Sequence, residues 1–137
     1  MLTFFARGKP KAQPRVKATR RGAFAGVYDP GTANDWKTTV KAACLASWDG
    51  RQIMGPTKVC IAVSFDRPKK HYKGSTLRQE APSYHITKPD AENCSKAILD
   101  ALTDLGVWKD DSQVCDVRTV KQYAVAETGA QITITEL

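Results

Sequence analysis

The sequence predicts an α+β fold in which two main helices pack on a small mixed, mostly antiparallel sheet. Two observations predict it: two segments repeat apolar residues at helical spacing, and several short segments alternate apolar with polar residues. The chain has 137 residues and shows no internal repeat, a length typical of one domain with a real core. We therefore expect a single domain over residues 1–137.

The N-terminal part of the chain, residues 1–31, reads as a strand over 2–7 followed by a basic arm rich in Pro, Gly, Lys and Arg. Basic residues and no acidic ones lie in 1–28, and they account for the whole net charge of +7. A surplus of this kind favours a polyanionic partner, although a solvated tail is the alternative. The nucleic-acid contacts predicted in the arm are Lys11, Arg15, Lys17, Arg20 and Arg21.

The first helix is expected to begin at a cap provided by Thr32 or Asn34 and to end at Asp49-Gly50. Its apolar face would carry Trp36, Val40, Ala43, Cys44, Ser47 and Trp48. Residues 58–66 then alternate apolar and polar side chains, which predicts a half-buried strand.

Residues 66–87 form a long irregular stretch in which basic and aromatic side chains are interleaved. Loops of this length are usually functional or disordered, and this composition suits a nucleic-acid backbone with exposed bases. A merely solvated loop is the alternative. The predicted nucleic-acid contacts here and just beyond are Arg67, Lys69, Lys70, Lys73 and Lys88. We expect His71 and His85 to contact phosphate or solvent, because neither has a partner at metal-binding spacing.

The second helix is expected to start after Pro89, with Asp90 as its cap, and to stop at Gly106. Its buried stripe would consist of Cys94, Ala97, Ile98, Ala101 and Leu105, with Leu102 at the margin. Strands over 114–125 and 130–137 follow, with Gly129 in the turn between them.

Carboxylates gather around this second helix, and they admit two interpretations. Asp90 and Glu92 stand at its start, while Asp110 and Asp111 precede the next strand and are expected to return beside that start. In the structural interpretation these residues cap the helix, favour its dipole, form an i,i+4 pair with Lys96 and make a polar turn. In the functional one the carboxylates hold Mg²⁺ and the lysine contacts a phosphate oxygen.

Several classes of protein are disfavoured by what the sequence lacks. It has no G-x-x-x-x-G-K-[ST] loop, so we expect no nucleotide cofactor, and no convincing nucleophilic triad. It has no run long enough for a membrane span and no signal-peptide stretch, so we expect a soluble, cytoplasmic protein. Cysteines at positions 44, 60, 94 and 115 lack metal-binding spacing and are expected to be small buried thiols.

The stretch "KPDAENCSKAILDAL" with "GVWKDDSQV" resembles the signature of the RusA family of Holliday junction resolvases, found in bacteria and their prophages. That signature reads P-D or R-D, one residue, D-N, two residues, K, an apolar helix ending in D-A-L, then D-D-x-Q-V. The similarity is weaker but consistent at "GKPKAQPR", "FDRPKKHY" and "ITITE", so it covers most of the chain.

The resemblance implies a Mg²⁺-dependent, homodimeric endonuclease that resolves four-way DNA junctions by paired symmetric cuts. By position, the essential residues would be Asp90, Glu92, Asp111 and Lys96, with Asp110 beside them as a further metal ligand. This chain has Glu92 where the family usually has Asp, which leaves the metal position open. Two other functions therefore stay open: a catalytically inactive DNA-binding protein of the same fold, and a nuclease for other branched DNA.

Overall fold

The structure is a computed structural model that describes the backbone of residues 1–15, 17–21, 24–28 and 30–137, and the side chains of residues 1–15 and 30–137. The strands of the described part are β1 (Leu2–Arg7), β2 (Lys17–Arg21), β3 (Phe24–Tyr28), β4 (Thr57–Phe65), β5 (Tyr72–Lys73), β6 (Thr76–Leu77), β7 (Val114–Tyr123) and β8 (Gly129–Glu136). The helices are α1 (Asn34–Leu45), α2 (Ala91–Leu105) and the 3₁₀ turns η1 (Lys69–His71) and η2 (Asp111–Gln113).

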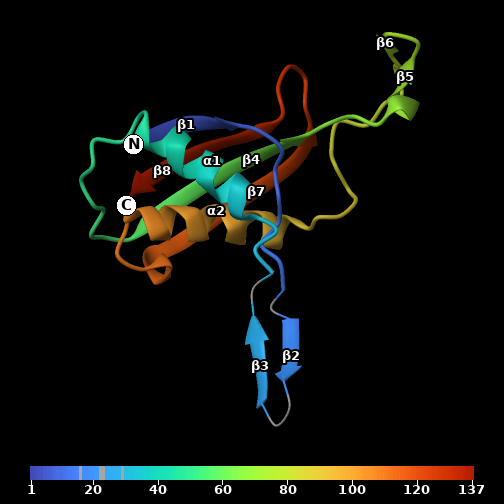
Figure 1. The fold of residues 1–137 in the computed structure, drawn as a ribbon. Helices are drawn as coiled ribbons and strands as arrows, with labels where there is room; N and C mark the ends of the chain where they lie inside the picture. Colours follow the sequence, from blue (N-terminus) through green and yellow to red (C-terminus); the bar gives the residue numbers. More distant parts are fainter. Residues whose placement is uncertain (16, 22–23, 29) are drawn as a thin grey trace.

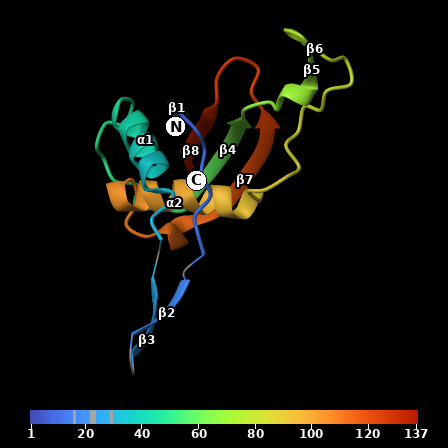
Figure 2. The ribbon, with the colours of Figure 1, turned by 45° about the vertical axis from the view of Figure 1, so that its right-hand side comes forward.

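A four-stranded sheet with the order β1-β8-β4-β7 forms the body of the molecule. The β1–β8 and β8–β4 pairs are antiparallel, whereas β4 and β7 are parallel and are joined by a crossover that contains α2. Both α1 and α2 lie on one face of this sheet (Figures 1 and 2). The predicted α+β class with a mixed, mostly antiparallel sheet is therefore confirmed.

The core lies between the sheet and the two helices. Alternate residues of β4 are buried there, as the period of two in its sequence predicts. The buried apolar side chains of the core include Phe4, Trp36, Val40, Val59, Ile61, Val63, Ile98, Leu102, Trp108, Ile132 and Ile134. Ion pairs between Lys37 and Asp100 and between Lys41 and Asp104, each at 3.5 Å, join the outer surfaces of α1 and α2.

The limits of the first helix differ from the prediction at both ends. Its N-cap is Ala33, which has no side-chain hydrogen bond, rather than Thr32 or Asn34. It ends at Leu45 because the amide of Ser47 bonds to the carbonyl of Cys44, the i→i−3 pattern that tightens a last turn. Ser47 and Trp48 therefore lie beyond the helix, although Trp48 still packs against the core.

Two predictions about burial were also wrong. Leu102 is fully buried while Leu105 is half-buried, because α2 contacts α1 as well as the sheet and its apolar stripe is correspondingly wider. Of the four cysteines expected to be buried, Cys60 is half-buried and Cys115 is exposed. Cys115 lies on the edge strand β7, where the register shift between the partners Val114 and Asp116 leaves it as the extra residue of a bulge.

Two antiparallel hairpins project from the body (Figures 1 and 2). The predicted basic arm contains the β2–β3 hairpin, and the irregular stretch over 66–87 contains η1 and the small β5–β6 hairpin. Of the predicted arm contacts, the side chains of Lys17, Arg20 and Arg21 lie outside the described residues. No helix in the described part of the chain is long and apolar enough to cross a membrane.

Candidate metal and nucleic-acid site

The start of α2 is organised by Asp90, which is its N-cap as predicted. One carboxylate oxygen, Oδ1, accepts the backbone N–H of Asn93 at 2.7 Å, and Oδ2 accepts the Asn93 side-chain amide at 3.4 Å. At the other end Gly106 adopts a left-handed conformation with φ 88°, the usual geometry of a helix stop. The cap leaves further lone pairs on the exposed Asp90 carboxylate, so capping does not prevent it from binding a cation.

Glu92 and Lys96 form the predicted i,i+4 pair on the solvent side of α2. Lys96 Nζ lies 3.6 Å from Glu92 Oε1, and both side chains are largely exposed. Exposed pairs of this kind contribute little to stability. Both groups are therefore accessible to a ligand that approaches this face of the helix.

Asp110 and Asp111 form a second carboxylate cluster before β7. Asp110 Oδ1 accepts the backbone N–H of Ser112 at 3.0 Å, and this hydrogen bond, followed by one from Asp111, lowers the pKa of Asp110. The hydrogen bond with Asp110 raises the pKa of Asp111, and burial and the charges of Asp110 and Asp100 raise it further. A cation bound here would relieve that repulsion.

The two clusters lie at different places along α2. Asp111 is close enough to Asp100 to feel its charge, and Asp100 is ten residues beyond Asp90, about 15 Å along the helix. Figure 1 likewise shows the turn before β7 near the end of α2 opposite to Ala91. The prediction that Asp110 and Asp111 return beside the helix start is wrong within one chain. The short connection after Gly106 brings the chain back at the C-terminal end of α2.

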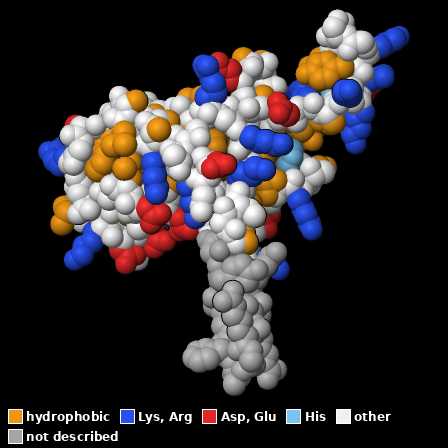
Figure 3. Space-filling view, viewed as in Figure 1, with side chains coloured by type: hydrophobic (Ala, Val, Ile, Leu, Met, Phe, Trp, Pro, Cys, Tyr) orange, Lys and Arg blue, Asp and Glu red, His pale blue; other side chains and the backbone are white. Residues whose placement is uncertain are grey.

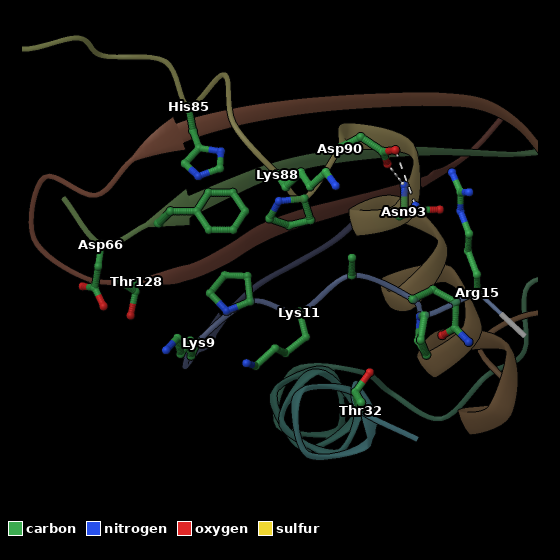
Figure 4. Close-up of a pocket in the computed structure, with 16 residues that line it drawn as sticks. Lys9, Lys11, Arg15, Thr32, Asp66, His85, Lys88, Asp90, Asn93 and Thr128 are labelled. Atoms are coloured by element: carbon green, nitrogen blue, oxygen red, sulfur yellow. Dashed lines mark hydrogen bonds between the residues drawn. The ribbon is translucent and has the colours of Figure 1, made fainter. Parts of the chain in front are cut away.

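A basic pocket of about 930 Å³ opens beside Asp90. The predicted DNA contacts Lys11, Arg15 and Lys88 line it together with Asp90 and Asn93 (Figure 4). The arm is held against α2 by a hydrogen bond of 2.9 Å from the backbone N–H of Gln13 to the carbonyl of Asn93.

The remaining predicted contacts lie between the end of β4 and the β5–β6 hairpin or within it: Arg67 precedes η1, Lys69 and Lys70 are in η1, and Lys73 is in β5. Figure 3 shows Lys and Arg side chains along this side of the molecule, whereas Asp and Glu gather over the C-terminal part of α2. Lys69, Lys70 and Lys73 are exposed. Arg67 is half-buried and donates to the carbonyl of Pro82 at 2.7 Å, so its guanidinium also holds the loop in place.

The two histidines are buried, not exposed as expected. His85 stacks on Phe65 with 4.0 Å between ring centroids, and the rings of His71 and Tyr123 are perpendicular with 4.8 Å between their centroids. Burial, followed by the charge of Lys121, lowers the pKa of His85, and burial with Arg67 lowers that of His71. Both rings are therefore packed against other aromatic side chains, and His85 also lines the pocket described above.

Lys121 is a positioning residue that sequence reasoning missed. Its Nζ donates to the carbonyls of Thr87 and Pro89 at 2.6 Å each and so fixes the entry into α2 from β7. The signal in the sequence is a lysine within a predicted strand. In the structure this lysine pairs with the buried Val63 of β4. Such a lysine needs polar partners to be tolerated, and the partners here are backbone carbonyls.

The donor set suits Mg²⁺, but one chain does not complete a site. Carboxylate oxygens are the ligands that Mg²⁺ prefers, and one or two of them with substrate phosphate and water usually suffice. Among the described residues, no group of three or more His, Cys, Asp or Glu side chains lies close enough to hold a metal ion. The four candidate ligands are divided between the start of α2 and the turn before β7.

The α+β fold thus presents carboxylates at a helix start beside a basic pocket, an arrangement with groups for a cation and for a polyanion. The sequence profile "Endodeoxyribonuclease RusA" matches residues 7–135. The chain therefore belongs to the RusA endodeoxyribonuclease family.

Individual relatives differ in how much of the chain they match. The uncharacterized protein YqaN of Bacillus subtilis is 29% identical over 126 residues, which is 90% of this chain and 88% of YqaN. The crossover junction endodeoxyribonuclease RusA of Escherichia coli K12 is 46% identical over 48 residues, 35% of this chain and 40% of RusA. The RusA protein of Enterobacteria phage 82 has the same identity over the same length. The matched part thus spans less than half of the RusA enzymes.

Proposed function

We propose that this protein is a Mg²⁺-dependent endonuclease that resolves four-way DNA junctions by paired symmetric cuts, in recombination and repair. The observation that carries the proposal is the position of the family's acidic motif. Asp90, Glu92 and Lys96 lie at the N-cap and in the first turns of α2, and Asp90 lines a pocket that also has basic residues in its lining. Family membership and the local similarity to crossover junction endodeoxyribonucleases support the same function.

In this proposal each group has one task. Asp90, Glu92, Asp110 and Asp111 would hold Mg²⁺, which when bound supplies Lewis-acid activation of the scissile phosphate and of a water nucleophile. Lys96 neutralises charge that develops on a phosphate oxygen. Lys11, Arg15 and Lys88 hold the neighbouring backbone phosphates and so fix the register of the strand, without reading its sequence. Because hydrolysis of a phosphodiester is downhill, no nucleotide cofactor is needed.

We also propose that the active form is a homodimer that acts in the cytoplasm. The separation of the two carboxylate clusters along α2 supports a dimer in which Asp110 and Asp111 of one protomer lie against Asp90 and Glu92 of its partner. A two-fold axis would then create two equal sites, which matches the two equivalent strands of a four-way junction.

The direct test compares DNA structures. Purified protein is incubated with an end-labelled four-way junction or with a linear duplex of the same sequence, each with Mg²⁺ or with EDTA. We expect cuts at symmetric positions in two opposing strands of the junction, only with Mg²⁺, and none in the duplex. Tight junction binding without cutting would instead favour an inactive DNA-binding protein. If flap DNA tested in the same way is cut in preference to junctions, the protein is a nuclease for other branched DNA.

A further inference from the structure

The pocket beside Asp90 is larger than a site for a phosphodiester group needs to be. Its volume of about 930 Å³ lies at the upper end of the range for sites that enclose whole small molecules. It lies between the first part of the basic arm, the end of β4 and the start of α2 (Figure 4). The pocket therefore has room for a group bulkier than a backbone phosphate.

The lining of this pocket has two chemically different parts. The cationic part consists of Lys9, Lys11, Arg15 and Lys88, which come from the arm and from the segment before α2. The apolar part consists of Pro10, Ala12, Pro14, Phe65 and Pro89. A phosphate group would use the first part only, whereas a nucleotide has an anionic part and a flat apolar part that match both.

A stacked aromatic pair, Phe65 and His85, forms part of the lining. Phe65 is half-buried, and His85 packs on one of its faces with an angle of 20° between the ring planes. His85 is 9% exposed, and its backbone N–H donates to the carbonyl of Lys121 at 3.2 Å. Its Nδ1 is buried without a hydrogen-bond partner, which is unusual for a ring that serves packing alone. Stacking on such a pair is favourable for any nucleobase.

We infer that this pocket receives one unstacked nucleotide from the branch point of the DNA, with its base against Phe65 and its phosphates on Lys11, Arg15 and Lys88. The inference rests on the proposed function and narrows its substrate to DNA in which a nucleotide can leave the stack. Unstacking costs a few kcal/mol in an intact duplex. It costs less where the stack is interrupted, as it is where the four arms of a junction meet. The pocket thus discriminates against linear duplex while it places the adjoining phosphate beside Asp90.

Photo-crosslinking tests the position of the base. Four-way junctions carry 5-iodouracil at single positions around the branch point, and the full-length protein is bound at saturation in EDTA before irradiation. We expect one branch-point position to crosslink to the peptide that contains Phe65 or His85, and no crosslink to it from the matched linear duplex. Crosslinks only to other peptides, or none from any branch-point position of a fully bound junction, would overturn the inference.

Variants separate the aromatic pair from general folding. At equal occupancy, Phe65→Leu should lower the crosslink yield by at least about tenfold, and Phe65→Tyr should retain it, because only the tyrosine keeps a ring to stack on. Tyr84→Leu is the matched control, since Tyr84 is an exposed aromatic residue on the neighbouring segment that does not line the pocket. A loss of yield in the Tyr84 variant equal to that in Phe65→Leu would contradict the assignment.

Cleavage of the unmodified junction with Mg²⁺ is measured on the same preparations. Symmetric cleavage without a crosslink to the pocket rejects the pocket and leaves the proposed function intact. A crosslink to Phe65 or His85 without any cleavage supports the pocket and rejects the nuclease function.

Discussion

Asp90 combines a structural position with a candidate catalytic one. Its carboxylate closes the first turn of α2 through the backbone N–H of Asn93, and the same side chain stands at the edge of the basic pocket. The structural interpretation of the sequence was therefore correct for Asp90, and also for the Glu92–Lys96 pair. Neither finding removes the functional interpretation, because both carboxylates remain open to solvent.

The chemistry of Asp90 can be tested without unfolding α2. Asn is as good an N-cap as Asp, so Asp90→Asn should keep the helix while it removes the negative charge. We expect junction cleavage with Mg²⁺ to fall at least ~10²-fold, the size typical of electrostatic catalytic groups, and Asp111→Asn to behave alike. Single-turnover rates check this, with circular dichroism and junction affinity as controls. Near wild-type rates in both variants would show that these carboxylates are structural.

Glu92 tests the departure from the family signature. Glu92→Asp restores the usual residue and should keep the cleavage rate within about an order of magnitude, whereas Glu92→Gln should lose activity if the carboxylate holds the metal. Rates measured over a range of Mg²⁺ concentrations separate weaker metal binding from a slower chemical step. An inactive Asp variant beside a fully active Gln variant would leave Glu92 only its interaction with the helix dipole.

At the residue scale, the sequence predicted correctly those features that depend on residues close together in the chain. The Asp90 cap and the Gly106 stop depend on neighbours within a few positions, and both are present. The exposure of Cys115 depends on the place of β7 at the edge of the sheet, and the burial of His85 depends on a stack between distant segments. Neither leaves a local signal in the sequence.

At the scale of elements, α2 was predicted closely, but its relation to β7 was not. Lys121 lies late in β7 and holds the segment before α2, so the helix runs antiparallel to that strand. The turn at Asp111 consequently falls near Asp100. Periodicity within a helix gives its buried face but not the direction in which the next strand leaves it, which tertiary packing decides.

The basic arm gives a quantitative prediction at this scale. Neutralising Lys11, Arg15, Lys17, Arg20 and Arg21 to Gln should reduce the slope of log K against log salt by about 0.9 for each of these residues that binds a phosphate. We expect two to four of them to do so on the junction, which corresponds to a slope change of about 2 to 4. Filter binding over a range of salt concentrations measures the slope. An unchanged slope would show that the arm is a solvated tail and would leave DNA binding to the segment over 66–88.

At the scale of the whole molecule, the division of the carboxylates predicts an outcome for mixed dimers. Asp90→Asn and Asp111→Asn are purified separately, and each should be inactive. If each site combines Asp90 of one protomer with Asp111 of its partner, a mixed dimer has one site with both substitutions and one with neither. Mixing should therefore restore cleavage of one strand, because each mixed dimer has one intact site where the wild-type dimer has two. If the site lies within one chain, no combination restores it.

The fold was easier to predict than the site because it leaves repeated patterns in the sequence. Alternation in β4 and β8 and the apolar stripe of α2 are repeated signals, and the α+β sheet follows from them. The site depends on single residues whose distances are set by packing and, in the proposed dimer, by a second chain. No pattern within one sequence specifies that second chain.

Cleavage of a supercoiled plasmid that extrudes a cruciform tests the central proposal most directly. Two coordinated symmetric cuts at the four-way junction convert the supercoiled circle directly to a linear molecule, whereas one cut gives only a relaxed, nicked circle. We expect linear product from the wild-type protein with Mg²⁺, with ends that map to the cruciform, and no product with EDTA or with Asp90→Asn. Binding of the cruciform without any cut, or cleavage at sites unrelated to it, would contradict the assignment of this protein as a Mg²⁺-dependent junction resolvase.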